Sequence, residues 1–343
     1  MYTVLLLAVS IAPGLAFLVV IMRMDRREPE PKALVARVLG LGAASGIVAA
    51  LVEAAFDGLP IFHAPGLGGP AAEAFLLVAP VEELCKLGVV LLFVWGNPNF
   101  NEENDGVVYV GASAVGFAVL ENIAYVVQNG IGTGVLRAFT SVPLHVLTAV
   151  VVGLFVGRAH FAPSAGARTR LVLAGFLFAW AAHGAYDTFA LSHSALAALL
   201  LPLLAGVAAF GIMAMRKGRR LSLLRWGAGP LPGSAQPAQP GPHPAPRHAH
   251  RPGDHRWMSV VARILLGLCA AFWALFVIGV TQRDFKDDLG TAILGAALMS
   301  FLPLGLGVLL EISYHRHRRH AAALAALAAG GGAAAPGSGA GPG

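Results

Sequence analysis

Charged residues are scarce in this chain of 343 residues. They make up 12% of the sequence, whereas soluble proteins contain about 25%. Hydrophobic residues make up 57% of the chain, and the mean hydropathy is +0.70. This balance excludes both an ordinary soluble protein and a disordered chain, and it indicates a protein that resides in a lipid bilayer.

Cysteine is also rare, and several protease signatures are missing. The two cysteines, Cys85 and Cys269, both lie in apolar stretches. A disulfide between them would have to form inside the bilayer, so a disulfide framework is excluded. The HExxH motif of zinc metalloproteases is absent. No apolar stretch carries the Gly-Asp or Ser/His arrangement expected of aspartyl or serine intramembrane proteases.

The sequence does contain long apolar stretches. Runs of at least 18 apolar residues are typical of membrane-spanning helices. We therefore predict an all-α, polytopic helical membrane protein with about nine transmembrane helices. The predicted spans are residues 2–22, 33–55, 71–95, 106–128, 137–159, 171–191, 195–215, 258–280 and 290–312.

The distribution of Lys and Arg predicts the orientation of these spans. If the N-terminus is outside, 18 of the 24 Lys and Arg residues fall in inside segments. Only Arg137, Arg283 and Lys286 then fall in outside segments. This bias predicts an outside N-terminus and an inside C-terminus. Because the basic residues are explained as a topology signal, we expect no nucleic-acid partner.

Composition divides the chain into four segments. Residues 1–215 form a seven-span core, and residues 216–257 form a Pro/Gly/His-rich segment expected to be a disordered cytoplasmic linker. Residues 258–312 form a two-span appendage, and residues 313–343 form a basic stub with a low-complexity Ala/Gly tail. The histidines of the linker lie in a coil broken by prolines, which favours solvated side chains over a metal site.

Ionisable residues inside spans are the main functional signal, because each costs about 2.5 to 3.5 kcal/mol to insert at the bilayer centre. They occur in four consecutive spans. The residues are Glu82, Glu83 and Lys86 in the third span, Glu121 and Asn122 in the fourth, His145 in the fifth, and His183 and Asp187 in the sixth.

Helical spacing and depth predict that these residues meet. Glu82 and Glu83 lie four and three residues before Lys86, so all three share a helix face. Glu82, Glu121, His145 and His183 each lie about 12 to 15 residues from the inside end of their spans, which is roughly 20 Å at 1.5 Å per residue. We expect one site at this depth, reached more easily from outside. Small residues in the fourth and fifth spans, Gly111, Ala112, Gly116, Gly153 and Gly157, are expected to let the helices approach closely.

Carboxylates and imidazoles at one depth suit the activation of a water molecule, which is hydrolase chemistry. Two other classes of protein stay open. A proton- or ion-coupled transporter also places acids and histidines in mid-membrane, although the inverted repeat typical of transporters is not evident. A non-catalytic membrane scaffold would use the same polar residues only to hold helices together.

The order and spacing of the motifs resemble the PrsW family of intramembrane proteases. The motifs are EExxK at Glu82 to Lys86, the run DG…Y…G…GFA..EN..Y from Asp105 to Tyr125, PLH ending at His145, and HxxxD at His183 and Asp187. The resemblance covers roughly residues 1–215 and is strongest over 79–190. The related CAAX prenyl proteases and bacteriocin-processing enzymes usually carry His where this chain has Glu121, so the sequence favours PrsW.

This resemblance implies an intramembrane endopeptidase of the bacterial cytoplasmic (inner) membrane. Its substrates would be membrane-anchored proteins or peptides, with anti-sigma-factor-like regulators as one class. The resemblance indicates no oligomeric state, and it leaves the linker and the last two spans unexplained.

The resemblance also implies roles for the eight polar residues. Glu82 would be the general base, Glu83 its supporting carboxylate and Lys86 their counter-charge. Asn122 would donate to the oxyanion, and Asp187 would orient His183. Zn²⁺ or another divalent metal would be held by Glu121, His145, His183 and Asp187. A mechanism that uses glutamate and histidine without a metal also stays open.

Overall fold

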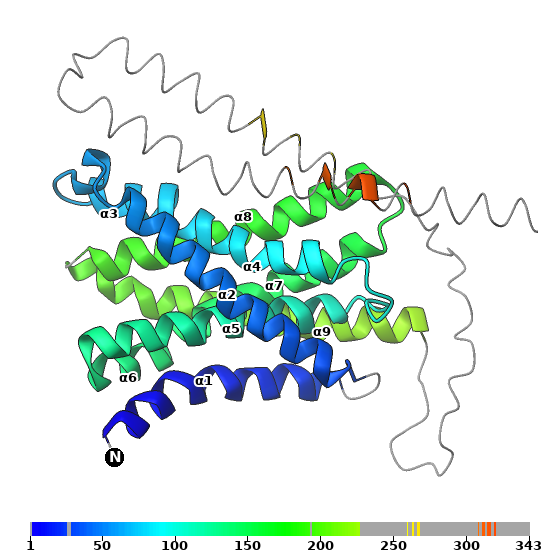
Figure 1. Cartoon of the computed structure of the whole chain (residues 1–343), viewed down its shortest axis with the longest axis horizontal. Helices are drawn as coiled ribbons and strands as arrows, with labels where there is room; N and C mark the ends of the chain where they lie inside the picture. Colours follow the sequence, from blue (N-terminus) through cyan, green and yellow to red (C-terminus); the bar gives the residue numbers. More distant parts are fainter. Residues whose placement is uncertain are drawn as a thin grey trace, which may run out of the picture.

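The computed structural model describes residues 2–25, 29–192 and 194–226, together with isolated positions between 259 and 319. Throughout these ranges the regular structure is helical, without strands (Figure 1). The elements in chain order are α1 (Tyr2–Met24), α2 (Lys32–Phe56), η1 (Pro60–His63), α3 (Gly68–Glu73), η2 (Ala74–Val78), α4 (Ala79–Phe93), α5 (Asp105–Asn129), α6 (Ile131–Phe139), α7 (Ser141–His160), α8 (Ala165–Leu191), η3 (Ala195–Leu199) and α9 (Leu200–Trp226).

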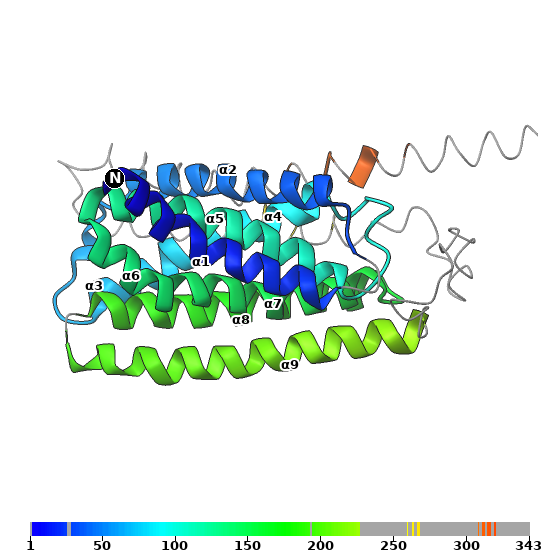
Figure 2. The ribbon, with the colours of Figure 1, turned by 90° about the horizontal axis from the view of Figure 1, so that it is seen from below.

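Successive long helices run in alternate directions (Figures 1 and 2). The C-terminal ends of α1, α4, α7 and α9 therefore gather at one end of the bundle with the N-terminal ends of α2, α5 and α8. Arg23, Lys32 and Arg158 belong to these helix ends, so we call this the basic end.

Five of the described helices are long and apolar enough to cross a membrane: Val4–Arg23, Lys32–Phe56, Asp105–Asn129, Ile131–His160 and Ala195–Leu221. Helix α4, which carries Glu82, Glu83 and Lys86, and helix α8, which carries His183 and Asp187, are not among these five. The predicted spans at 258–280 and 290–312 lie almost entirely outside the described residues.

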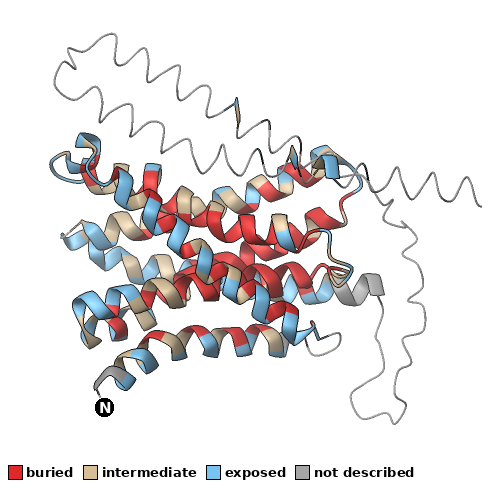
Figure 3. Cartoon of the chain, in the orientation of Figure 1, coloured by how far each residue is buried: buried red, intermediate tan, exposed pale blue. Residues whose placement is uncertain are grey.

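Helix α5 occupies the centre of the bundle, where it packs against α7, α2 and α1 (Figure 3). In its most apolar window 72% of the residues are buried, compared with 22% in α1 and 11% in α9. The outer helices expose aliphatic side chains instead, such as Leu5 and Val20 of α1 and Leu201 of α9. Apolar residues exposed in this pattern are suited to contact with lipid tails.

The third predicted span contains an irregular turn immediately before its acidic residues. Residues Ala74–Val78 form a π-helical turn between α3 and α4. Pro80 follows in the first turn of α4, and its missing N–H and ring geometry disturb regular α-helical bonding to the preceding turn. Such π turns are frequent at functional sites, and this one leads directly to Glu82 and Glu83.

Two helix boundaries differ from the predicted spans. The fifth span, predicted as 137–159, is divided at Thr140 into α6 and α7, because Thr140 has a non-helical backbone (φ −124°, ψ −74°). Helix α9 continues to Trp226, into the predicted linker, since Arg, Lys and Leu are good helix formers. Residues 227–257 lie outside the described ranges.

Glycines let α5 approach its neighbours with backbone against backbone, as the small-residue pattern predicts. A Cβ on Gly157 of α7 would lie 1.9 Å from the carbonyl oxygen of Glu103, and one on Gly153 would lie 2.5 Å from that of Gly106. On the other side of α5, a Cβ on Gly116 would lie 1.9 Å from the carbonyl oxygen of Leu39 in α2. These contacts leave no room for a side chain.

Two glycines in α2 provide a matched test of this packing. A Cβ on Gly42 would lie 2.1 Å from the Ser113 carbonyl oxygen, whereas one on Gly40 would have no neighbour within 4 Å. We expect Gly42→Ala to destabilise the protein by about 1–3 kcal/mol through overpacking. Gly40→Ala should be neutral or slightly stabilising, since Ala is favoured over Gly in helices by about 1 kcal/mol. Thermal unfolding in detergent compares the variants, and equal melting temperatures would contradict the packing.

Candidate active site

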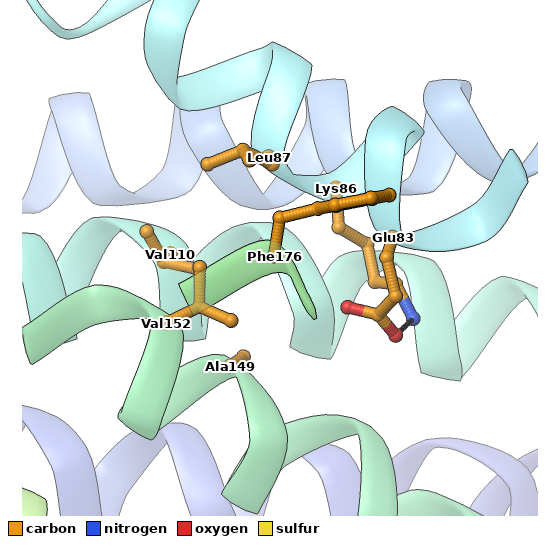
Figure 4. Close-up of a pocket in the computed structure, with 7 residues that line it drawn as sticks. All are labelled: Glu83, Lys86, Leu87, Val110, Ala149, Val152 and Phe176. Carbon is orange, nitrogen blue, oxygen red and sulfur yellow. Dashed lines mark hydrogen bonds and ion pairs between the residues drawn. The ribbon is translucent and has the colours of Figure 1, made fainter. Parts of the chain in front are cut away.

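Three charged side chains from the first two turns of α4 form the centre of the site. Glu82 and Glu83 are each 4% exposed, and Lys86 is 2% exposed. The Lys86 Nζ atom lies 2.6 Å from Glu83 Oε1 and 3.5 Å from Glu82 Oε2. Figure 4 shows the Glu83 carboxylate and the Lys86 ammonium directed at one another, beside a narrow cavity with apolar walls that include Val110 and Phe176.

Two buried histidines face this group from neighbouring helices. His145 lies on α7 and His183 on α8, and their ring centroids are 5.0 Å apart. The Nδ1 atom of His145 lies 3.0 Å from Lys86 Nζ. The Nδ1 atom of His183 lies 2.9 Å from Glu83 Oε1. The structure thus brings side chains of α4, α7 and α8 together, as the sequence predicts.

Glu82 is held less tightly than Glu83. Its Oε2 atom lies 3.5 Å from Lys86 Nζ, 3.7 Å from His183 Nε2 and 3.8 Å from His145 Nδ1. Most of these separations exceed a good hydrogen bond, whereas Glu83 makes contacts of 2.6 and 2.9 Å. The Glu83 carboxylate is therefore fixed in place, whereas the Glu82 carboxylate faces the two imidazoles across longer distances.

The remaining predicted acids, Glu121 and Asp187, each lie beside one of the histidines. Glu121 of α5 places Oε2 at 2.8 Å from His145 Nε2. Asp187, one turn after His183 on α8, places Oδ2 at 3.1 Å from His183 Nε2. An acid bound to a ring nitrogen fixes the orientation of the imidazole. These contacts suit Glu121 and Asp187 to orienting the histidines.

Asn122 has a different environment from the one that an oxyanion donor needs. Its side chain is fully buried, and Nδ2 donates to the backbone carbonyl of Ser10 in α1 at 3.1 Å. Its Oδ1 accepts a bond from Arg137 Nε at 3.2 Å. Both polar groups of Asn122 thus hold neighbouring elements together, and the amide is directed toward α1.

Sequence reasoning missed Arg137, which it counted only as an outside topology residue. In the structure the Arg137 guanidinium lies 2.7 Å from Glu121 Oε1 and 3.9 Å from the centre of the Tyr125 ring. Its side chain is 12% exposed. The turn at Gly130 (φ 82°) folds α6 back toward α5 and brings these groups together. Residue spacing along one helix does not reveal a contact made across such a turn.

Glu53 of α2 is only partly exposed. It lies near enough to the site for the charges of Glu121, His183 and Lys86 to act on it. The sequence contains only a weak indication that Glu53 lies near the site, because Glu53 is only three residues from the end of its helix.

The mixed donors at the centre of the site fit a divalent metal. One atom from each of Glu82, His145 and His183 lies within 4.8 Å of the others. Zn²⁺ binds nitrogen and oxygen at about 2.0–2.2 Å, so tetrahedral ligands lie roughly 3.3 Å apart. The 3.7 and 3.8 Å separations from Glu82 to the two histidines are close to this value. The other two predicted ligands, Glu121 and Asp187, lie next to the histidines, with carboxylate oxygens 2.8 Å from His145 Nε2 and 3.1 Å from His183 Nε2.

Comparison with known proteins gives one consistent family. Residues 30–215 match the family described as PrsW family intramembrane metalloprotease. "Protease PrsW" of Geobacillus kaustophilus is 36% identical over 183 residues, which cover 53% of this chain and 78% of that protein. "Protease PrsW" of Bacillus subtilis is 27% identical over 220 residues, which cover 64% of this chain and 98% of that protein. No solved structure matches the chain significantly.

The central ion pairs lead to a stability prediction. Replacing Lys86 by Met leaves two buried carboxylates without their shared ammonium group, so we expect a loss of about 3–5 kcal/mol. The measurement is the melting temperature of purified protein in detergent. Lys32→Met is the control because Lys32 is exposed, and it should change stability little. If Lys86→Met were as stable as the wild type, the two glutamates could not both be ionised in the folded protein.

Proposed function

The chain belongs to the PrsW family of intramembrane metalloproteases, and from this premise we propose that Glu82, His145 and His183 activate the water that attacks the peptide bond. The observation that carries the proposal is the position of Glu82 Oε2, within 3.5–3.8 Å of Lys86, His145 and His183. These gaps suit a carboxylate that shares a water molecule with its neighbours.

The proposal assigns different tasks to the two adjacent glutamates. Glu82 accepts the proton of the attacking water, because its carboxylate is the less restrained and faces both imidazoles. Glu83 supports the site, since its Oε1 atom is already engaged by Lys86 and His183. The Lys86 ammonium offsets the cost of burying both carboxylates and favours the charged form that a general base needs.

A divalent metal, where bound, would be held by Glu82, His145 and His183. It would supply Lewis-acid polarisation of the carbonyl and a more acidic bound water. Charge balance favours such an ion: in the described contacts Lys86 pairs with Glu82 and Glu83, Arg137 pairs with Glu121, and Asp187 contacts only His183, so the carboxylates outnumber the fixed cations. We propose a divalent metal such as Zn²⁺, because its preferred ligands are nitrogen and oxygen donors of this kind.

Around this centre, the proposal gives Glu121 and Arg137 a positioning role. Arg137 forms an ion pair with one oxygen of Glu121, and the other oxygen of Glu121 lies 2.8 Å from His145 Nε2. This chain of contacts leaves the His145 Nδ1 atom directed toward Lys86 and Glu82. Asp187 contacts His183 at Nε2, the ring nitrogen that also faces Glu82, while His183 Nδ1 faces Glu83. Asn122 holds Arg137 and α1 in place.

The proposed setting is the bacterial cytoplasmic membrane, with nine spans, the N-terminus outside and the basic end inside. The alternating helices, the five apolar ones and the basic residues at one end support this topology. The proposed substrates are membrane-anchored proteins or peptides, including anti-sigma-factor-like regulators. The family match and the convergence of the polar residues on one site favour this function over a transporter or a scaffold.

Replacement of Glu82 by Gln tests the proposal. Gln keeps the shape of the side chain but cannot accept a proton, so cleavage of a single-span peptide reconstituted in liposomes should fall about 10²–10⁴-fold. Asp57→Asn is a matched control at an exposed carboxylate and should cleave like the wild type. Melting temperatures confirm that both variants fold. Undiminished cleavage by a folded Glu82→Gln variant would refute the assigned role of Glu82.

A further inference from the structure

Helix α8 contacts the π-helical turn η2, which precedes Glu82, and a hydrogen bond joins the two elements. The indole N–H of Trp180 in α8 donates to the backbone carbonyl of Phe75 in η2 at 2.8 Å. The two aromatic rings also meet edge to face, with centroids 5.9 Å apart and planes at 88°. Both side chains are partly buried. The proposed mechanism gives neither residue a role.

The Phe75 carbonyl needs a donor from outside its own helix. In the π turn, the N–H of Ala79 bonds to the carbonyl of Ala74, five residues earlier. The same spacing would pair the Phe75 carbonyl with the N–H of residue 80, but this residue is Pro80 and has none. A carbonyl left without a donor inside a protein is costly. The Trp180 indole thus supplies the donor that Pro80 lacks.

The π turn determines the direction in which Glu82 and Glu83 point. A π turn bonds residues five apart instead of four, and each residue advances an α-helix by about 100°. If the turn relaxed to a regular α-helix, the residues after it would therefore rotate by about 100° relative to those before it. Such a rotation would take Glu83 away from His183, whose Nδ1 atom lies 2.9 Å from Glu83 Oε1. The π turn is therefore part of the geometry of the site.

Trp180 belongs to the same face of α8 as the site residues. His183, Gly184 and Asp187 follow it by three, four and seven residues, which is the spacing of one helix face. The Phe75 ring packs on this face, because a Cβ on Gly184 would lie 2.6 Å from the Phe75 Cδ1 atom. The Trp180 hydrogen bond therefore ties the π turn to α8 within one helical turn of His183.

We infer that Trp180 is a positioning residue for the proteolytic reaction: its N–H holds the π turn, and the turn holds Glu82 and Glu83 opposite His183. This inference rests on the proposed function of Glu82. Trp180 acts through the backbone of Phe75 and not on the substrate. The role depends on the indole N–H, so it is lost when the N–H is removed and an aromatic ring is kept.

The variant Trp180→Phe makes this change. We expect kcat for cleavage of the reconstituted single-span peptide to fall about 10²-fold, because small misplacements of catalytic groups have effects of this size, while KM stays within about twofold. Thr169→Val is the matched control on α8. It removes the hydrogen bond from the Thr169 hydroxyl to the Ala165 carbonyl, 3.1 Å long, and should leave kcat unchanged. An unchanged kcat in a folded Trp180→Phe variant would overturn the inference.

Melting temperatures in detergent test the hydrogen bond without any measurement of cleavage. Pro80→Ala restores a backbone N–H that can satisfy the Phe75 carbonyl within its own helix. Trp180→Phe should therefore lower the melting temperature by about 2–4 °C when Pro80 is present and by less in the Pro80→Ala background. Equal losses in the two backgrounds would overturn the inference. If Trp180→Phe alone does not fold, the double variant should fold, and its failure to fold would be equally contradictory.

Glu82→Gln, assayed in the same liposomes, separates this inference from the proposed function. Because Trp180 acts through the α4 carboxylates, Trp180→Phe should cause little further loss of kcat in the Glu82→Gln background, and a full further loss would contradict the inference. Normal cleavage by Glu82→Gln would refute the role of Glu82 itself. A normal kcat in Trp180→Phe beside an impaired Glu82→Gln would refute only the role of Trp180.

Discussion

The Lys86 ammonium group, buried among two glutamates and a histidine, is the contact on which the rest of the site depends. A charge inside a helical bundle is costly unless a partner of opposite sign lies close to it. The 2.6 Å contact with Glu83 and the longer contact with Glu82 provide such partners. They also make the two carboxylates different, because Glu83 is tied to Lys86 and His183 while Glu82 remains available to the imidazoles.

Helix α5, at the centre of the bundle, holds the helices around the site in place. Glycines on both of its sides let α2 and α7 approach with backbone contacts, and α5 contributes Glu121 to the site. There Glu121 faces Arg137 and His145.

Much of this organisation could be predicted from the sequence, because length and hydropathy determine which helices suit a bilayer. Spacing along α4 and α8 predicted the pairs of Lys86 with Glu83 and of His183 with Asp187, since contacts within a helix follow its periodicity. Contacts across turns were not predicted. Arg137 reaches Glu121 through the reversal at Gly130, and the charge of Glu53 in α2 interacts with the charges of the site. The direction of Asn122 toward Ser10 likewise depends on how α1 packs.

The central claim is that Glu82 and His183 act together on one water molecule, and a double-mutant cycle tests it most directly. The kcat/KM for cleavage of a reconstituted single-span peptide would be compared for the wild type, Glu82→Gln, His183→Ala and the double variant. Residues that act as a unit give strongly non-additive losses, so the double variant should cleave about as slowly as the slower single variant. Losses that multiply would show that the two residues act independently and would contradict the account.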